Sequence, residues 1–197
     1  MASLREAQKL QTRRLLRDTA LECFAAKGYA ATTIDDIAGG AGTTRTTFYL
    51  HFSSKSQLMQ AVISDIDEIF TSADDPPLAT VVERGDRALV EAWLSRKFDQ
   101  WAEVRPHLTA TYQVAAVDPE IQAGLDAWFE DVAGAIHEGL DRADRFDAET
   151  RRIRAVLAFG QLEYLCKRWL RVGWAVDREI CLRTLTDSWC HLLAPGD

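Results

Sequence analysis

Residues 33–52 read TIDDIAGGAGTTRTTFYLHF, and this segment decides the fold. Thr33 can cap a short helix, because Asp36 lies three residues on, in the position from which an acid reaches back to the helix start. The glycine-rich stretch 39–42 permits a tight turn. Thr43 or Thr44 can then cap a second helix that ends at about Leu50. The segment therefore predicts a helix-turn-helix.

The second of these helices is expected to have one apolar and one polar side. Phe48 and, just beyond the helix, Phe52 point into a core in this interpretation. The other side carries a polar set: Arg45, Thr46, Thr47 and Tyr49. A polar, hydrogen-bonding surface at the start of a helix is what the reading of base edges in the major groove requires. These residues predict a DNA-reading face.

Residues 48–58, FYLHFSSKSQL, resemble the recognition end of a tetracycline-repressor (TetR) type regulator. The similarity covers about residues 13–58 and includes FAAKGY at 24–29 and TTI at 32–34. Two positions depart from the family pattern, since Thr43 stands where Val is usual and Thr46 where a small residue is common. The resemblance implies an N-terminal three-helix DNA-binding domain over residues 1–60, and an effector-binding and dimerisation domain over residues 61–197.

Charge is divided unevenly along the 197 residues, whose net charge is −7. Residues 1–60 hold eight Lys or Arg against five Asp or Glu, whereas the remainder holds fifteen against twenty-five. A basic head on an acidic body directs phosphate contacts to one end, although a net of +3 over sixty residues is also an ordinary solvated surface. Arg5, Lys9 and Arg13 are further candidates for phosphate contacts from a flexible arm, or are simply solvated.

The chain as a whole is predicted to be all-α, with about nine helices, because no segment alternates as a strand does. Outside the helix-turn-helix, the expected helices cover residues 10–27, 55–70, 81–104, 106–117, 119–143, 147–172 and 177–193, the last two with their capping Asp included. Arg105-Pro106 is expected to break the chain between two of them.

The last two helices are apolar around much of their circumference. Two such helices from each of two protomers would form a four-helix seam, which is also where TetR-type proteins dimerise. The alternative is that both helices are central to one core. The candidate dimer residues are Leu157, Tyr164, Trp169, Leu185 and Trp189.

Candidate DNA contacts extend beyond the reading helix. Arg45 is expected to reach guanine, while Thr46 and Thr47 meet base edges. Phosphate contacts are expected from Thr33, Thr44, Tyr49, His51 and Lys55. For Tyr49 and His51 the alternative is packing and capping within the head, and the resemblance favours the DNA role.

A small-molecule site is expected among the aromatic residues of the C-terminal domain, which contains all six tryptophans. The candidates are Trp93, Trp101, Tyr112, Trp128, Phe129, Phe159 and Glu163. Aromatic side chains at helical spacing are more often core than pocket. Glu163 suits either a cationic ligand or an ion pair with Lys167, Arg168 or an Arg across the dimer, and the ion pair is favoured.

Other classes of protein fit the sequence less well. No metalloprotease, phosphate-loop, nucleophile-elbow or dinucleotide motif is present, which argues against an enzyme. Four cysteines without a Cys-x-x-Cys spacing are expected to be buried thiols, with no cofactor and no metal. No apolar run suits a signal peptide or a membrane span, so a cytoplasmic protein is expected.

The sequence is therefore interpreted as a one-component, dimeric repressor that binds a pseudo-palindromic operator and is released by a small effector. The alternative is a helical interaction adaptor or small-molecule-binding protein without a DNA role. That alternative would leave the polar face from Arg45 to Lys55 without a purpose.

Overall fold

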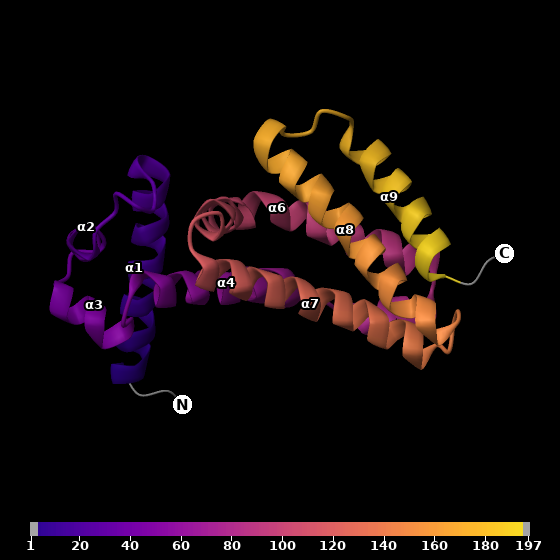
Figure 1. Ribbon diagram of the computed structural model, residues 1–197, viewed down its shortest axis with the longest axis horizontal. Coiled ribbons are helices and arrows are strands. Elements are labelled where there is room, and N and C mark those ends of the chain that lie inside the picture. The colour runs from indigo at the N-terminus through magenta and orange to yellow at the C-terminus, as the bar shows by residue number, and fades with distance from the viewer. Residues whose placement is uncertain (1–3, 195–197) are drawn as a thin grey trace. The chain divides into compact units, whose positions relative to one another are not determined.

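The computed structural model describes residues 4–194, and within them every regular element is an α-helix (Figure 1). The nine helices are α1 (Leu4–Lys27), α2 (Ile34–Gly40), α3 (Arg45–His51), α4 (Lys55–Thr71), α5 (Leu78–Arg84), α6 (Arg87–Ala115), α7 (Pro119–Arg142), α8 (Ala148–Val172) and α9 (Arg178–Leu193). The predicted all-α fold is confirmed. No helix between residues 4 and 194 has both the length and the hydropathy needed to cross a membrane.

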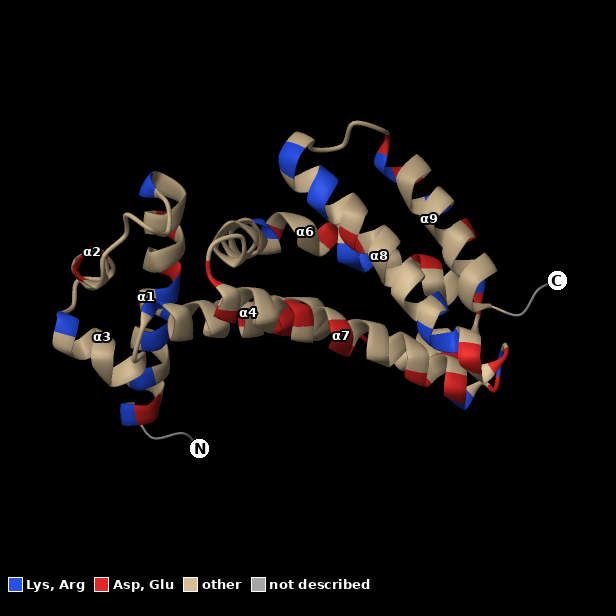
Figure 2. Cartoon of the chain, viewed as in Figure 1, with Lys and Arg blue, Asp and Glu red and all other residues tan. Residues whose placement is uncertain are grey.

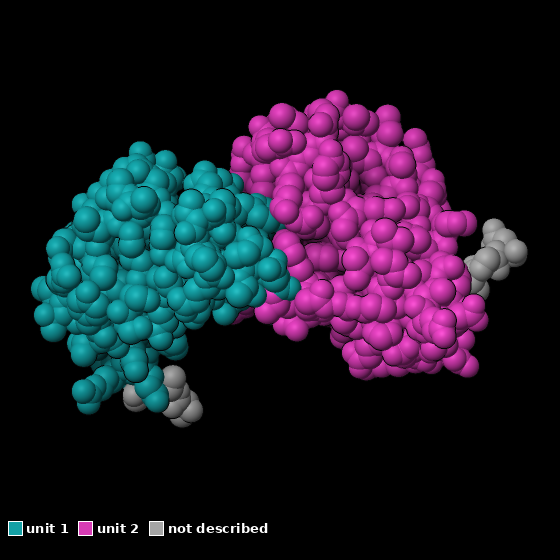
Figure 3. Space-filling model, in the orientation of Figure 1, with its two compact units in different colours: residues 1–67, 106–126 teal, residues 68–105, 127–197 magenta. Residues whose placement is uncertain are grey.

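The chain divides into two compact units (Figure 3). Unit 1 comprises residues 1–67 and 106–126, and unit 2 comprises residues 68–105 and 127–197. Helices α4, α6 and α7 each contribute residues to both units. The functional division predicted at residue 60 stays a prediction.

Helices α1, α2 and α3 form the head of unit 1, in which α2 packs against both α1 and α3. Its core includes Leu16 and Phe24 from α1, Ile37 from α2, and Phe48 and Phe52 at α3, all essentially inaccessible to solvent. The predicted inward positions of Phe48 and Phe52 are confirmed. Because the apolar residues of such short helices cannot bury themselves, tertiary packing has to stabilise α2 and α3.

Two positions of the helix-turn-helix require glycine, each for a different reason. Gly42 has a φ of 63°, the left-handed conformation that a turn between crossed helices needs. A Cβ on Gly40 would lie 2.7 Å from Cγ2 of Thr19, so a side chain there would push α2 away from α1. The glycine-rich stretch therefore supplies both a turn and a close helix contact.

The helix predicted over residues 81–104 is wrong, because two helices share this region. α5 ends at Gly85, whose φ of 64° is left-handed and whose amide bonds to the carbonyl of Val81 at 3.1 Å. Asp86 then accepts hydrogen bonds from the amides of Ala88 and Leu89, at 2.8 and 3.1 Å, and so begins α6. These stop and start signals outweigh the continuous apolar pattern.

The break predicted at Arg105-Pro106 is also wrong, because α6 continues through Pro106 to Ala115. A proline inside a helix removes the hydrogen bond to the carbonyl four residues earlier, here that of Ala102. Ala102 and Pro106 both face solvent, so water can satisfy that carbonyl. The exposed position lowers the cost of the proline.

The helix starts predicted in the C-terminal part are confirmed. α7 begins at Pro119, α8 follows Asp147, and α9 follows Asp177, whose carboxylate accepts the amides of Glu179 and Ile180. Asp147 stands at the predicted position, but its side chain makes no capping hydrogen bond to α8. α8 and α9 pack side by side in unit 2 (Figure 1). All four cysteines are unpaired, but only Cys166 is buried, and burial raises the pKa of its thiol to about 12.

Candidate functional site

The start of α2 is fixed by a reciprocal cap. Oγ1 of Thr33 accepts the amide of Asp36 at 3.1 Å, and the amide of Thr33 donates to the Asp36 carboxylate at 2.7 Å. The predicted capping box is therefore confirmed. Lys27 lies 2.5 Å from the same carboxylate, and this partner, followed by Thr33, lowers the pKa of Asp36. Asp36 is thus fully engaged in holding α2.

The start of α3 presents the predicted polar face. Oγ1 of Thr44 accepts the amide of Thr47 at 3.2 Å, so Thr44 is the cap and not Thr43, the other residue that the sequence allowed. Arg45, Thr46 and Tyr49 are exposed. Figure 2 shows basic residues along α1 and at the start of α3. The polar side chains of α3 are thus exposed on one side of the helix, and its apolar side chains are packed on the other.

The end of α3 is held by Arg13. Its Nη1 donates to the carbonyl of His51 at 2.8 Å, and its guanidinium lies 4.3 Å from the centre of the Phe52 ring. Arg13 lies within α1, so the idea that it belongs to a flexible arm is wrong. Burial, and then the charges of Lys9 and Arg13, lower the pKa of His51, so its ring is neutral at pH 7.

Lys55 binds backbone carbonyls of the loop that follows α1. Its Nζ donates to the carbonyls of Tyr29 and Thr32 at 2.8 and 2.7 Å and lies 4.4 Å from the centre of the Tyr29 ring. Burial lowers the pKa of this ammonium. Lys55 therefore fastens the loop after α1 to the start of α4, and only its third N–H is left for the predicted phosphate contact.

A polar cluster behind the head joins that loop to the start of α7. Asp118 accepts hydrogen bonds from Oγ of Ser56 at 2.9 Å and from the Tyr29 hydroxyl at 3.3 Å. Burial opposes ionisation of Asp118, but these bonds and the amides of Glu120 and Ile121 together lower its pKa. Burial, with the Asp118 charge, raises the pKa of Tyr29. Within unit 1, the cluster therefore holds the start of α7 against the loop after α1 and the start of α4.

Unit 2 brings three of the predicted aromatic ligand residues together with Phe70, which was not predicted. Phe159 of α8 lies 5.5 Å from Phe129 and 6.3 Å from Trp128 of α7, between ring centres. Trp128 also stacks on Phe70 at 6.0 Å. All four rings are partly exposed, so they form an aromatic surface rather than a closed core.

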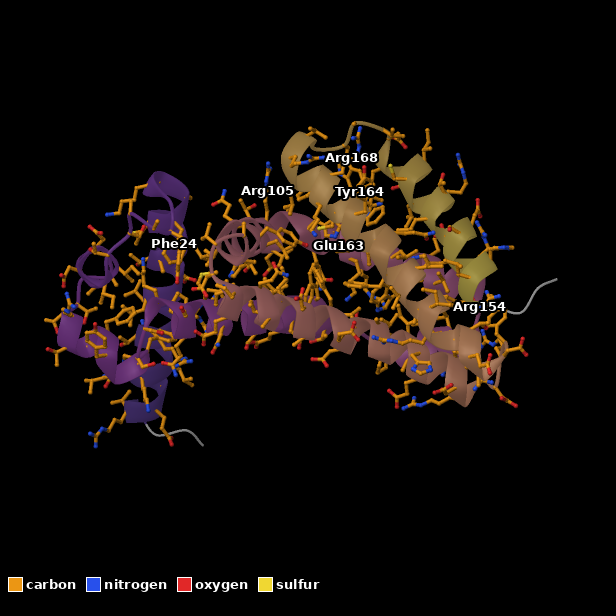
Figure 4. The ribbon with its side chains drawn as sticks, in the orientation of Figure 1. Phe24, Arg105, Arg154, Glu163, Tyr164 and Arg168 are labelled. Carbon is orange, nitrogen blue, oxygen red and sulfur yellow. The ribbon has the colours of Figure 1, made fainter. Side chains whose placement is uncertain are left out.

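Glu163, labelled on α8 in Figure 4, has a side chain that is only 19% exposed. Its carboxylate pairs with Lys167, one helical turn along α8, and Lys167 lies 5.7 Å from the Phe129 ring centre. The ion pair that the sequence favoured over a ligand role is confirmed.

The other predicted ligand residues lie elsewhere. Trp93 is buried against Trp189 at 5.5 Å, and its indole nitrogen donates to Asp74 at 3.0 Å. Trp101 is buried in a separate cluster with Phe98, Trp169 and Trp174. Tyr112 belongs to unit 1. The seven candidates are therefore not one constellation.

The predicted dimer residues divide into surface and core. Leu157 and Tyr164 on α8 are 51% and 64% exposed. Trp169 is half-buried against Trp101. Leu185 and Trp189 are buried within unit 2, and the Trp189 indole donates to the Ala158 carbonyl at 3.0 Å. These last two belong to the α8–α9 core and do not present a surface.

Comparison with known proteins gives the same assignment along independent lines. Residues 16–62 match the family described as bacterial regulatory proteins, tetR family. Over 94 residues the chain is 37% identical to the uncharacterized HTH-type transcriptional regulator TtgW of Pseudomonas putida. This match covers 48% of this chain and 69% of TtgW. The chain belongs to the TetR family.

Two further matches are a relative in sequence and a neighbour in fold. The HTH-type transcriptional regulator SrpR of Pseudomonas putida is 37% identical over 94 residues, and the match spans only 43% of its length. The crystal structure of NalD, the secondary repressor of the MexAB-OprM multidrug efflux pump in Pseudomonas aeruginosa, has a TM-score of 0.70 at 20% identity and covers 97% of this chain and all of its own. The latter likeness extends the shared fold to both units.

Membership of the TetR family makes the chain a transcriptional regulator and not an enzyme. Sequence reasoning missed several long-range contacts of this TetR-type head, namely Arg13 as the cap of α3, Asp35 as the partner of Arg45, and Asp118 as the acceptor of the Ser56 hydroxyl. Their partners lie between 10 and 89 residues away, so no local pattern marks them. Trp174, which completes the cluster around Trp101, was missed for the same reason.

Proposed function

We propose that the protein is a dimeric, cytoplasmic repressor that binds a pseudo-palindromic operator through α3 and is released by a small molecule bound in unit 2. The observation that carries this proposal is the polar face of α3, which is exposed although its opposite face is fully buried. A helix of this kind can enter the major groove with its N-terminal side chains against base edges.

The roles proposed at the operator follow from exposure and hydrogen-bonding capacity. Arg45 contacts guanine, and Thr46 and Thr47 contact neighbouring base edges. The phosphate contacts are assigned to the helix caps and to the residues around the end of α3: Thr33, Thr44, Tyr49, His51 and Lys55. A salt titration tests this, because operator binding by a regulator weakens steeply with salt. Binding that is independent of salt would refute the proposal.

The dimer proposed here uses the outer face of α8, where Leu157 and Tyr164 are exposed. A two-fold dimer presents two equal reading helices, so the operator should be a pseudo-palindrome with half-site centres about 34 to 36 Å apart, or a small multiple of that distance. Footprinting should show two equivalent protected half-sites. Protection of one asymmetric half-site by one protomer would contradict the dimer.

The effector site proposed here includes the partly exposed rings of Trp128, Phe129 and Phe159, next to the Glu163–Lys167 pair. Aromatic surface with a few polar groups is typical of small-molecule sites. NalD, which shares the fold, is described as the secondary repressor of a multidrug efflux pump.

Helix α4 is the proposed link from the effector site to the head. At its C-terminal end, Lys97 donates to the carbonyl of Phe70, and Gln100 donates to that of Ile69 at 2.6 Å. At its N-terminal end, Lys55 and Ser56 hold the loop after α1 and Asp118. A ligand that displaces α6 would therefore pull on a helix whose other end is fixed to the head.

Thermodynamic linkage tests this coupling. An effector that releases the protein must bind the DNA-incompetent state better, with a coupling of about 1 to 3 kcal/mol in typical systems. Operator DNA must then weaken effector binding by the same factor. Tryptophan fluorescence can follow the titration, because all six tryptophans lie beyond residue 60. Equal affinity with and without operator would rule out induction by that compound, and tighter affinity on DNA would indicate co-repression.

A further inference from the structure

Arg45, the base-reading candidate, is held by two neighbours. Its Nη1 lies 3.0 Å from the Asp35 carboxylate on α2, and its Nη2 donates to the Tyr49 hydroxyl at 3.4 Å. Arg45 is the only Lys or Arg between Lys27 and Lys55. The single strong positive charge of the reading face is therefore paired with an exposed carboxylate on α2.

Asp35 has no structural task of the kind that Asp36 has. These two are the only acidic residues between Glu22 and Asp65. Asp36 caps α2 and pairs with Lys27, whereas the Asp35 side chain pairs with Arg45. The Asp35 and Arg45 side chains are 64% and 57% exposed. An ion pair this exposed adds little to stability, so its consequence is to be sought in DNA binding.

The pair affects two modes of DNA binding differently. On DNA of arbitrary sequence, Arg45 can contribute only by attraction to phosphates, and the neighbouring carboxylate offsets that attraction. At a guanine, the guanidinium acts through directed hydrogen bonds. Of its five N–H donors, one points to Asp35 and one to Tyr49, and three remain, which suffices for a bidentate contact.

We infer that Asp35 is a specificity-determining positioning residue, which acts through Arg45 by orienting the guanidinium and by penalising contacts to the DNA backbone alone. The inference rests on the proposed role of α3 in operator binding. Specificity is a difference between two affinities, so a group that weakens the wrong complex more than the right one increases it.

The experiment compares Asp35→Asn and Asp35→Ser with the parent protein; both residues are accepted near helix starts. Each protein is titrated with a duplex recovered by selection of bound genomic fragments and with a scrambled duplex of the same composition. Glu22→Gln, an exposed residue of α1, is the control with the same change in charge. The three are also made with Arg45→Ala.

Loss of Asp35 should tighten binding to the scrambled duplex by about 3- to 10-fold and change binding to the selected duplex by less than about 2-fold. Their ratio then falls by about 3- to 10-fold, whereas Glu22→Gln leaves the ratio unchanged. In the Arg45→Ala background the substitution at Asp35 should no longer alter the ratio, and a purely structural role would not produce this dependence.

An unchanged or increased ratio in both Asp35 variants would overturn the inference, as would the same fall in the Arg45→Ala background. These outcomes are distinct from failure of the proposed function. If the parent protein bound selected and scrambled duplexes equally, operator recognition itself would be refuted.

Discussion

The outer faces of α3 and α8 are both exposed, but they differ in chemistry. The face of α3 carries Arg45, Thr46 and Tyr49, whereas that of α8 carries Ile153, Leu157 and Tyr164. A row of donors and acceptors remains well solvated when free and can exchange water for base edges and phosphates. An apolar row gains free energy only when another apolar surface covers it.

The difference fits the two kinds of partner proposed for this chain, namely DNA and a second copy of itself. The α3 face requires rigid packing beneath it so that its donors are fixed in space, and the buried rings of Phe48 and Phe52 provide that packing. The α8 face requires only a matching surface, and in the proposed dimer a second copy of the same face would provide one under two-fold symmetry. Breaking each face separately therefore should have separate consequences.

The largest effect is expected from Phe48→Ala, because this ring is completely buried under the reading face. Loss of a buried Phe costs about 3 to 5 kcal/mol, so the head should unfold more readily and operator binding should fail. Leu50→Ala is the matched control, since Leu50 lies two residues away and is 73% exposed. Chemical denaturation followed by circular dichroism measures both. Equal destabilisation by the two variants would show that the Phe48 ring does not support the reading face.

The α8 face is tested by Leu157→Glu. A charge at the centre of an apolar interface should weaken dimerisation by about 2 kcal/mol or more, or roughly 30-fold, while each protomer remains folded. Val117→Glu, at an exposed apolar residue of unit 1, is the control. Sedimentation equilibrium gives the dimer dissociation constant. A dimer of unchanged strength in Leu157→Glu would move the interface away from this face.

A smaller effect is expected from Lys55→Ala. Removal of the ammonium leaves the carbonyls of Tyr29 and Thr32 without their donor, which should cost about 1 kcal/mol. Because two of its donors are engaged in the head, the salt slope of DNA binding should fall by less than about one. Lys9→Ala, on the exposed side of α1, should leave stability unchanged. Thermal melting and salt titration separate the two effects, and a full unit of slope without loss of stability would make Lys55 a plain phosphate contact.

The smallest effect concerns His51, whose pKa is lowered by burial and by Lys9 and Arg13. The unfolded chain takes up this proton at about pH 6.5, before the folded protein does. Stability is therefore complete above that pH and declines as the pH falls through the lower folded value. His51→Gln should flatten this decline in melting temperature. A decline of the same size in the variant would assign the pH dependence to other groups.

Local patterns in the sequence predicted the head well. Thr33, Asp36 and Thr44 act within three residues along the chain, so their caps can be read directly. The burial of Phe48 and Phe52 follows from their spacing. The same kind of signal located the starts of α7, α8 and α9.

Features that depend on distant partners could not be predicted. The aromatic residues of unit 2 follow helical spacing whether they line a surface, as Phe159 does, or fill a core, as Trp101 does. Their sorting depends on which helix lies opposite. Pro106 was misjudged because its tolerance depends on solvent exposure, which composition alone does not reveal.

The most direct test of the account is the sequence preference of Arg45→Ala. Binding of the parent and the variant is measured over a set of duplexes in which each base pair of the selected operator is changed in turn, with Arg14→Ala on α1 as the control. Arg45→Ala should cost about 1 to 3 kcal/mol on the operator and should lose its preference at one base position in each half-site, with the other positions unaffected. An unchanged preference at every position, with all duplexes weakened alike, would contradict the claim that α3 reads the operator through Arg45.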